Sequence, residues 1–474
     1  MAEALAADCA AWAMVHGMMI HPRGPDGTQQ PVHVPFALLP SPFPLEAFRL
    51  ADSVQPLVNA LVDSVSRDPV FLAEACGSIA DVDDFSRRLF GVHLEALAQD
   101  HKQPITLGIH RSDYLLHVSE SNMPPSLLQV EINTISAGLP SLSSIVADMH
   151  QFALETSQLA HDHHAQHPGA VLPASASLAG VAAGIGSAWR LFGRPEAIVV
   201  MVVQPVEFNI FDQRWIEFTL YRDFGVRLVR KTLTQIHAEA RLEGPEKRLF
   251  IGDAEVAVVY FRAGYTPRDY PTENEWTART TLEISHAVKC PSIAYHLAGT
   301  KKVQQMLAMP GGLERFVSNP SDARLLRSTF TGLYPLDDSP EGEAAYKMAL
   351  ETPERFVLKP QREGGGNNTY GTKIREVLTA MTPRERMAFI LMDLIVAPPF
   401  SAAVVRNGQV SECDVVSELG IFGVWLSSHD GVHMNTAAGH LLRTKSASVN
   451  EGGLATGVAV IDTPLLVPGL VYAA

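Results

Sequence analysis

The segment LKPQREGGGNN, from Leu358 to Asn368, brings a lysine, a glutamate and three consecutive glycines together. Glycines let backbone N–H groups approach an anion closely, and the point charge of Lys359 suits a phosphate, so the pattern fits a loop that covers phosphates. It is not a Walker A motif, because no Gly-Lys-Ser or Gly-Lys-Thr follows the glycines, and it is not the dinucleotide-binding GxGxxG. Three glycines by themselves are equally typical of a flexible turn.

A second candidate pair, Glu131 and Asn133, stands two residues apart in the string EINTISA. If this string forms a strand, both side chains project from the same face. A carboxylate and an amide oxygen on one face suit Mg²⁺, and Glu363 of the glycine-rich segment would add a third oxygen. Taken alone, however, two polar residues on a strand usually face solvent.

Basic residues that could meet an anionic ligand are spread along the chain. They are Arg111, Arg262, Lys301, Lys359, Arg443 and Lys445. Arginine forks suit carboxylates and lysine ammonium groups suit phosphates. A nucleoside triphosphate together with a peptide that carries two carboxylates would need about this number of cations at one place. Each residue could instead lie on the surface or pair with a carboxylate, so the sequence alone does not show that they converge.

The elements that must position these residues change along the chain. Up to about residue 191, apolar residues mostly recur at helical spacing, which predicts a helix-rich region. From residue 194 to about 290, short β-branched runs alternate with amphipathic stretches, which predicts a parallel sheet covered by helices. Strands are expected at 197–203 and 256–261, and helices at 211–224 and 273–288. Ligand groups should lie just past the strand carboxyl ends, at Glu207, Asn209, Arg262 and Tyr265.

After residue 299 the pattern changes again, with strand signals at 356–359, 389–395 and 402–405. The dipeptide Asn407-Gly408 then leads into a further strand signal at 409–416, which predicts an antiparallel hairpin. This third region is therefore expected to be α+β. The three expected parts are 1–191, 192–297 and 298–474.

Composition restricts the class of protein. The chain has 474 residues, 46% hydrophobic and 19% charged, which suits two or three packed units with full cores. Its formal net charge of -14 argues against nucleic acid or an anionic membrane as a lasting partner, so an anionic substrate would need a local basic pocket. The longest apolar run, Ala197 to Val203, is too short to span a bilayer, which takes about 20 residues.

The cysteines and histidines give weaker signals. The four cysteines are Cys9, Cys76, Cys290 and Cys413. They are far apart and form no CxxC pair, which is typical of unpaired thiols and predicts a cytoplasmic protein. Glu3 and Asp8 precede any basic residue, so the N-terminus lacks the positive start of a signal peptide and is expected to form a surface or dimer helix. Four histidines within 161–167 lack a carboxylate or cysteine at a ligand spacing, which favours a solvated helix end or loop over a metal site.

Taken together and in order, these strings resemble the eukaryotic glutathione synthetase family of the ATP-grasp superfamily. The matching blocks are HRSDY from His110, EINTISA from Glu131, EFNIFDQ from Glu207, FRAGY from Phe261, AGTKKVQQ from Ala298, KPQREGGGNN from Lys359, SELGIFG from Ser417 and HLLRTK from His440. Each block is weak alone, but their common order from about residue 110 almost to the C-terminus is highly specific. The first forty or so residues match least clearly.

The resemblance implies an α/β and α+β chain with the ATP-grasp fold. Antiparallel sheets would surround ATP, a separate parallel-sheet domain would bind the substrate, and a glycine-rich lid would span about 330–410. The resemblance also implies a homodimer and the cofactors ATP and Mg²⁺. The implied reaction is an ATP-dependent ligation of γ-glutamylcysteine and glycine that passes through an acyl phosphate. Its products would be glutathione, ADP and phosphate.

The resemblance further assigns site residues. The implied catalytic residues are Arg443, Lys359 and Lys301. The implied magnesium ligands are Glu131, Asn133 and Glu363. The implied ATP-binding residues are Glu131, Lys301, Lys359, Pro360, Gln361, Arg362, Glu363, Gly364, Gly365, Gly366, Asn367, Asn368, Tyr370, Met392, Asp393, Leu394, Ile395, Glu418, Lys445 and Glu451. The implied substrate-binding residues are Arg111, Ile135, Ser136, Ala137, Gly138, Glu207, Phe208, Asn209, Gln213, Arg262, Ala263, Gly264, Tyr265, Arg443, Leu454 and Ala455.

A few positions depart from the family pattern. Ala263 stands where the family often has Asp, Glu451 stands where Asp is common, and Ser136 is followed by Ala-Gly-Leu-Pro. None of these departures removes a magnesium ligand or a phosphate lysine. Three alternatives remain: a non-catalytic nucleotide-binding relative, a related ligase with another amine acceptor such as β-alanine, and an unrelated kinase. Loss of catalysis should release the carboxylates and lysines of the site, and their presence argues against the first alternative.

Overall fold

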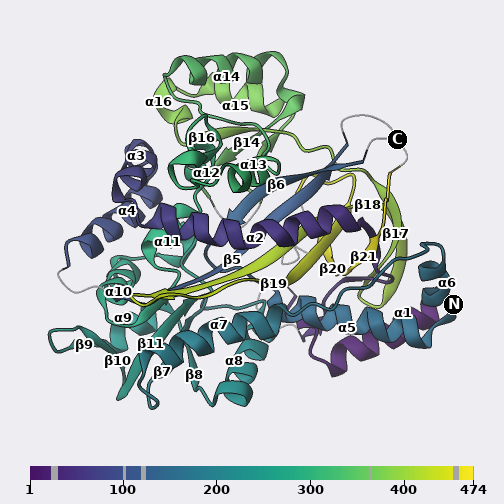
Figure 1. The fold of residues 1–474 in the computed structure, drawn as a ribbon, viewed down its shortest axis with the longest axis horizontal. Coiled ribbons are helices and arrows are strands. Elements are labelled where there is room, and N and C mark those ends of the chain that lie inside the picture. Colours follow the sequence, from purple (N-terminus) through teal and green to yellow (C-terminus); the bar gives the residue numbers. More distant parts are fainter. Residues whose placement is uncertain (23–29, 100–102, 119–123, 363–365, 452–457, 473–474) are drawn as a thin grey trace.

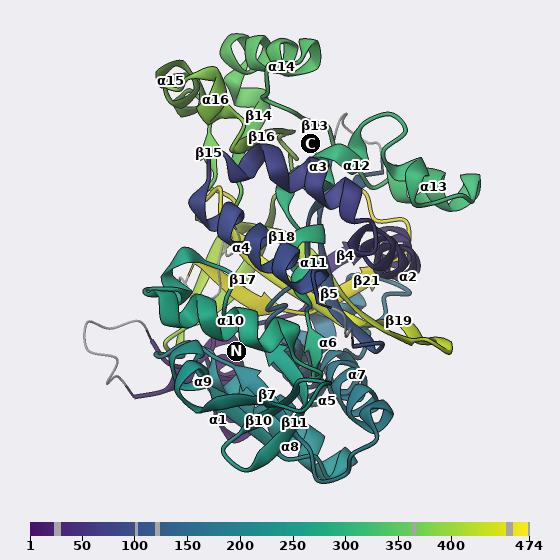
Figure 2. The same ribbon diagram turned by 90° about the vertical axis from the view of Figure 1, so that its left-hand side faces the viewer.

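The computed structural model describes residues 1–22, 30–99, 103–118, 124–362, 366–451 and 458–472. These residues form a mixed α/β structure (Figure 1). A small sheet with helices lies at one end, a long central sheet lies in the middle, and a second helix-covered sheet lies at the other end. A view turned by 90° shows the same order (Figure 2).

The central sheet joins segments that are far apart in the sequence. Its strand order is β17-β3-β20-β19-β18-β5-β6, and all neighbours are antiparallel except β20 and β3. The strands are β3 (Phe36–Ala37), β5 (Thr106–His117), β6 (Ser126–Asn133), β17 (Phe400–Arg406), β18 (Gln409–Ser428), β19 (Gly431–Ser446) and β20 (Ala459–Asp462). The region expected to be helix-rich therefore supplies two long strands, β5 and β6, and they pair with the C-terminal region through β18.

The hairpin predicted at Asn407-Gly408 is confirmed. Arg406 pairs with Gln409, and both turn residues have the positive φ angles, 50° and 74°, that a two-residue hairpin turn demands. β18 runs on to Ser428, well past the expected end at residue 416. It stays extended because β5 pairs with one edge of it and β19 with the other over residues 418–427.

Helices pack against both faces of the central sheet. Val424 and Trp425 are neighbours on β18 and pack into two different hydrophobic clusters, so the clusters lie on opposite faces. The Trp425 face packs against α2 (Leu45–Ser66), and the Val424 face packs against α5 (Pro140–Thr156) and α7 (Ser177–Phe192). The remaining N-terminal helices are α1 (Ala2–Val15), α3 (Pro69–Ala80), α4 (Asp84–Leu97) and α6 (Gln158–Ala165).

The second sheet contains the predicted parallel strands. β7 (Ile198–Val202), β8 (Leu228–Lys231), β11 (Ala254–Phe261) and β12 (Val288–Cys290) pair in parallel, while β9 (Ala240–Glu243) and β10 (Arg248–Ile251) add an antiparallel edge that the sequence pattern did not predict. Its helices are α8 (Ile210–Phe224), α9 (Leu233–Glu239) and α10 (Glu273–Ile284). The prediction that α10 reaches Val288 is wrong, because Val288 pairs with Val258 of β11 instead.

The small sheet at the other end has its own core. Its antiparallel order is β13 (Leu333–Tyr334), β16 (Phe389–Asp393), β14 (Phe356–Pro360) and β15 (Thr369–Tyr370), covered by α14 (Pro340–Glu351), α15 (Lys373–Ala380) and α16 (Pro383–Arg386). We call this part, residues 333–393, the cap. The elements around it are α11 (Ile293–Ala298), α12 (Lys301–Ala308) and α13 (Pro320–Arg327), and short pairs are formed by β1 (Met19–Ile20) with β2 (Val32–His33) and by β4 (Ser41–Pro44) with β21 (Pro464–Val467).

Three weaker sequence signals can be compared with this fold. All four cysteines are unpaired, as predicted. Two histidines of α6 hydrogen-bond to backbone carbonyls, His163 to that of Pro40 and His164 to that of Ala170. Among the described residues, no three or more His, Cys, Asp or Glu side chains form a group that could hold a metal ion. In the same part of the chain, no helix has the length and apolar character needed to cross a bilayer.

Candidate active site

One face of the central sheet carries a set of charged and amide side chains. Arg111 and Asp113 alternate along β5, and their cross-strand partners on β6 are Asn133 and Glu131. Cross-strand partners project from the same face, so all four side chains lie on the face opposite α2. The prediction that Glu131 and Asn133 share a face is therefore confirmed.

Asp113 lies at the centre of this group. Arg111 donates to it through Nε (2.6 Å to Oδ1) and Nη2 (2.8 Å to Oδ2), and Asn133 Nδ2 donates at 2.9 Å. From β19, Arg443 Nη2 donates to Asp113 Oδ2 at 2.9 Å and also pairs with Glu418 of β18. We call Arg111, Asp113, Glu131, Asn133, Glu418 and Arg443 the sheet cluster.

Two lysines approach the sheet cluster from other elements. Lys301, the first residue of α12, places Nζ 3.0 Å from Glu131 Oε2. Lys359 of β14 donates from Nζ to the carbonyl of Val130 at 2.9 Å. Burial by itself would raise the pKa of Glu131, but the charges of both lysines bring it down to about 2. Glu131 is thus a carboxylate at neutral pH.

Burial has the opposite outcome for Glu418. Its pKa is raised, because loss of solvent and the charges of Asp113 and Glu131 outweigh the attraction of Arg443. Burial also lowers the pKa of Lys445, whose Nζ donates to the carbonyl of Asn450. The face therefore contains converging cations and carboxylates, which are buried or half-buried.

A second charged group lies past the carboxyl ends of the parallel strands. Arg262, just after β11, pairs with Asp212 of α8 at 2.9 Å, and both side chains are almost fully buried. Burial would lower the pKa of Arg262, but Asp212 raises it instead. Gln213 accepts a hydrogen bond from Arg230 Nη2 at 2.5 Å, and Asn209 Nδ2 reaches Asp212 at 3.4 Å. Asp212 also accepts a hydrogen bond at 2.9 Å from the backbone of Ser141, in the first turn of α5, where N–H groups lack partners within the helix.

The loop 135–138 connects the two groups. Ser136 Oγ donates to the carbonyl of Arg262 at 3.1 Å, and the carbonyl of Gly138 accepts from Arg111 Nη1 at 3.0 Å. A Cβ at Gly138 would lie 3.0 Å from Arg262 Nη2, so only glycine leaves this guanidinium in place without a shift. The loop therefore lies between one arginine of each group.

The end of β14 and the described residues that follow it form hydrogen bonds and an ion pair with other parts of the chain. Gln361 accepts from the backbone of Lys302 at 3.1 Å, and Arg362 pairs with Asp83, the N-cap of α4. The backbone N–H groups of Gly366 and Asn368 both donate to the carboxylate of Glu451. Burial and the charge of Glu451 raise the pKa of Tyr370. The predicted residues Glu363, Gly364, Gly365, Leu454 and Ala455 lie outside the described residues.

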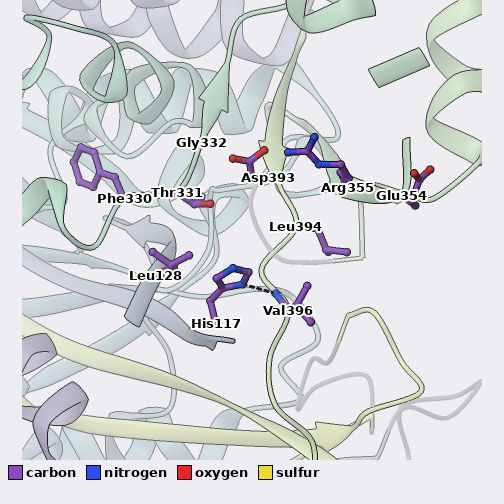
Figure 3. Close-up of a pocket in the computed structure, with 10 residues that line it drawn as sticks. All are labelled: His117, Leu128, Phe330, Thr331, Gly332, Glu354, Arg355, Asp393, Leu394 and Val396. Atoms are coloured by element: carbon purple, nitrogen blue, oxygen red, sulfur yellow. Dashed lines mark hydrogen bonds between the residues drawn. The ribbon is translucent and has the colours of Figure 1, made fainter. Parts of the chain in front are cut away.

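A cavity of about 510 Å³ lies between the cap and the end of β5 and β6 (Figure 3). Leu128 pairs with Leu115 across the strands, and a one-residue bulge keeps this pair on the same face as Asp113 and Glu131. The lining residues are His117, Leu128, Phe330, Thr331, Gly332, Glu354, Arg355, Asp393, Leu394 and Val396. The cavity thus extends the charged face toward a more apolar end.

Comparisons with known proteins identify the family. The family model described as "Eukaryotic glutathione synthase, ATP binding domain" matches residues 1–466. The chain belongs to the eukaryotic glutathione synthetase family. The glutathione synthetase of Homo sapiens is 43% identical, with 98% of this chain and 96% of the relative covered, and that of Xenopus laevis is 42% identical, with 96% and 95% covered. The chloroplastic glutathione synthetase of Arabidopsis thaliana is 41% identical over 98% of this chain and 85% of its own length.

A solved structure supports the fold alone. A glutathione synthetase-like effector of Globodera pallida, in its apo form, superposes with a TM-score of 0.76 at 24% identity, and the match covers 98% of this chain and 96% of the effector. The family resemblance predicted from the sequence blocks is confirmed, and with it the ATP-dependent ligase class.

The fold brings together most of the site residues that were predicted from the sequence. Arg111, Glu131, Asn133, Lys301, Lys359, Glu418 and Arg443 meet in or beside the sheet cluster, and Glu207, Asn209, Gln213 and Arg262 meet past the parallel strands. Five of the predicted residues are buried hydrophobic side chains: Ile135, Ala137, Ala263, Met392 and Ile395. Gly264 and Tyr265 donate backbone hydrogen bonds to Asp269. Phe208 accepts from the backbone of His21, Pro360 ends β14, and Asn367 is exposed.

Sequence reasoning missed the carboxylates that hold the arginines. Asp113 stands two residues after Arg111 in the HRSDY block, a spacing that puts opposite charges on one face of a strand. Asp212 lies inside the EFNIFDQ block. Arg230 follows the same rule as Arg262, because it lies toward the carboxyl end of a parallel strand, but the four-residue strand β8 was not predicted.

Proposed function

We propose that this chain joins γ-glutamylcysteine to glycine in an ATP-dependent reaction, with Arg443, Lys359 and Lys301 as catalytic residues. The free carboxylate of the dipeptide attacks the γ-phosphorus of ATP, which releases ADP and leaves an acyl phosphate. The amine of glycine then displaces phosphate and forms the peptide bond. The observation that carries the proposal is the convergence of Lys301, Lys359, Arg111 and Arg443 on one face of the sheet in a family of ligases.

The charged residues supply what phosphoryl transfer requires. The transferring group carries negative charge that fixed cations offset, so Lys301 and Lys359 act by position and charge rather than as nucleophiles. Both lysines are almost fully buried, and a low-polarity surrounding strengthens their attraction for phosphate oxygens. The backbone N–H groups of Gly366 and Asn368, now bonded to Glu451, are of the kind that bind phosphate oxygens.

The donor set fits a magnesium ion. Glu131 carries a negative charge at neutral pH, and Asn133 offers an amide oxygen on the same face, the hard oxygen ligands that Mg²⁺ prefers. We assign Glu131, Asn133 and Glu363 as the protein ligands, with phosphate oxygens completing the shell. When bound, the ion neutralises charge on the triphosphate and orients it.

ATP and the dipeptide are proposed to occupy different parts of the face. The cavity beside Asp393 and Leu394 takes the nucleoside end, since Leu128, Phe330 and Leu394 provide apolar surface there. The dipeptide lies along the loop 135–138, where Arg111 and Arg262 are held ready to bind its carboxylates. The proposed fold is ATP-grasp, with the cap and the glycine-rich segment as the lid and the parallel-strand part as the substrate-binding domain.

Two further properties, assembly and location, are proposed. The chain is expected to be a homodimer, as the family resemblance implies. It is expected to work in the cytoplasm, since its four cysteines are unpaired, although some relatives are named chloroplastic. No nucleic acid or membrane is expected as a partner, given the net charge of -14.

The decisive experiment follows ADP and peptide formation together. ADP should form, in step with a tripeptide product, only when ATP, γ-glutamylcysteine and glycine are all present. ADP formation with the dipeptide but without any amine, and with a stable phosphorylated product, would instead indicate a kinase. No turnover at all, despite ATP binding, would indicate a non-catalytic relative.

The acceptor can be tested in the same assay. The segment Glu451-Gly-Gly-Leu-Ala-Thr-Gly457 resembles the family's glycine-side loop. A site fitted to glycine misplaces an amine that is one methylene further away, and one methylene typically gives about 10- to 200-fold discrimination. Glycine should therefore exceed β-alanine by at least about tenfold in kcat/KM. Equal use of the two amines would favour the alternative ligase with a different acceptor.

A further inference from the structure

Asp113 is the most connected carboxylate of the sheet cluster, yet no substrate or metal role has been assigned to it. Its side chain is only 1% exposed. It accepts four hydrogen bonds: two from Arg111, one from Asn133 and one from Arg443. A buried carboxylate is costly unless its charge and lone pairs are satisfied, and here three side chains from three different strands satisfy them.

The contact with Asn133 decides which way its amide faces. The Nδ2 group of Asn133 donates to Asp113 Oδ2 at 2.9 Å and to the carbonyl of Arg111 at 3.1 Å. An amide nitrogen has two N–H donors, so both are used. The carbonyl oxygen of Asn133 is then the atom left for a cation, and the reverse orientation would press that oxygen against the charge of Asp113.

The contacts with the arginines decide where their remaining N–H groups point. Asp113 binds Arg111 through Nε and Nη2, which fixes the plane of the guanidinium and leaves Nη1 on the side of the Gly138 carbonyl. Arg443 uses one nitrogen, Nη2, for both Asp113 and Glu418. Its other nitrogens are thereby held in a defined direction on the same face.

We propose that Asp113 is a positioning residue that couples the metal side of the site to the dipeptide side. It orients Asn133 on one side and Arg111 and Arg443 on the other, without contacting a substrate itself. This inference rests on the proposed function. Its consequence is that one substitution at Asp113 should disturb the Mg²⁺ requirement and dipeptide binding together.

The test uses the full-length chain and compares Asp113→Asn with the unsubstituted protein. Loss of a group that orients metal ligands commonly costs about 10- to 100-fold. We expect an increase of that size in both the dipeptide KM and the Mg²⁺ concentration for half-maximal activity, and Asp113→Glu, which keeps the charge, should recover part of each. Asp113→Asn with either quantity unchanged would overturn the coupling.

Asp63→Asn is a matched control. Asp63 is also buried and also holds an arginine through Nε and Nη2, here Arg67 at 2.8 and 2.9 Å, but on α2, away from the sheet cluster. If Asp113 served only the fold, both variants would lower the melting temperature and leave both constants unchanged. We expect that result for Asp63→Asn alone.

A double-mutant cycle covers the case in which Asp113→Asn does not fold. Both Arg111→Lys and Asn133→Ala keep Asp113. The first replaces the two-nitrogen guanidinium contact by a single ammonium group, and the second removes the amide donor. If Asp113 links them, their effects on kcat/KM for the dipeptide are non-additive, whereas strictly additive effects overturn the link. Tripeptide formation by the unsubstituted protein tests the proposed ligase function. The ratios of kcat/KM between variants test the role of Asp113, so either proposal can fail while the other stands.

Discussion

Lys301 Nζ lies 3.0 Å from Glu131 Oε2, so a proposed phosphate lysine neutralises a proposed magnesium ligand before any substrate is bound. The pair offsets part of the cost of holding the carboxylate charge at this half-buried place. A cation bound by Glu131 would take over this neutralising role, and Lys301 would then be available to the phosphates. This exchange gives the first prediction.

Glu131→Gln should abolish turnover while leaving the fold intact. The amide keeps the shape of the side chain but removes the charge that holds Lys301 and binds a hard cation. The rate of tripeptide formation at saturating Mg²⁺ checks it, with circular dichroism as the measure of folding. Near-normal rates at high Mg²⁺ would show that Glu131 is not a metal ligand.

Gly138→Ala should raise the dipeptide KM by about tenfold or more, because the added methyl displaces Arg262 and small misplacements of binding groups are costly. Gly91→Ala on the exposed side of α4 is the control, since a Cβ there meets nothing within 4 Å. That variant should keep its KM and gain about 0.5–1 kcal/mol of stability. Steady-state kinetics and urea unfolding of both variants measure the two effects, and equal KM values would contradict the role of the loop 135–138.

Asp83→Asn should raise the KM for ATP several-fold and change kcat little. Asparagine still caps α4, but it no longer pairs with Arg362 of the glycine-rich segment. Asp68→Asn provides the comparison, because Asp68 caps α3 and pairs with Arg315 at 2.7 Å in the same manner. A similar change in the ATP KM for both variants would mean that the effect comes from the helices and not from the segment.

The stability of the chain should fall between about pH 4 and pH 6 through Asp462. Burial raises the pKa of Asp462 to about 6, although Ser41 and Thr444 donate hydrogen bonds to it. Because the folded chain holds this proton more tightly than the unfolded chain, the associated stability is present below about pH 4 and is lost as the pH rises through 6.

Urea unfolding of Asp462→Asn measures this effect. The variant lacks the titrating group, so the difference in unfolding free energy between it and the unsubstituted protein should grow by about 2 kcal/mol from pH 4 to pH 7. Asp253→Asn, at an exposed turn, should show no such trend. A constant difference across this pH range would mean that Asp462 does not titrate there.

Much of the local structure could be predicted from the sequence. The hairpin at Asn407-Gly408 is fixed by the two positive φ angles that these residue types tolerate, and the parallel strands β7 and β11 are fixed by runs of buried β-branched residues. Glu131 and Asn133 project from the same face because side chains alternate along a strand with a period of two residues. The family, and with it the ligase class, could be predicted because the eight sequence blocks and their order are read directly from the sequence, without the fold.

The tertiary structure alone decided which charges meet. Asp113 and Arg443 are 330 positions apart, and they come into contact because β18 brings β5 and β19 to its two edges. Asp212 and Arg262 meet because α8 returns to the carboxyl end of β11. Local sequence sets dihedral angles and hydrophobic faces, whereas the energy of a buried charge depends on partners that only long-range pairing supplies. The sequence therefore determined the kind of side chains in the site, and the fold determined how each one is oriented.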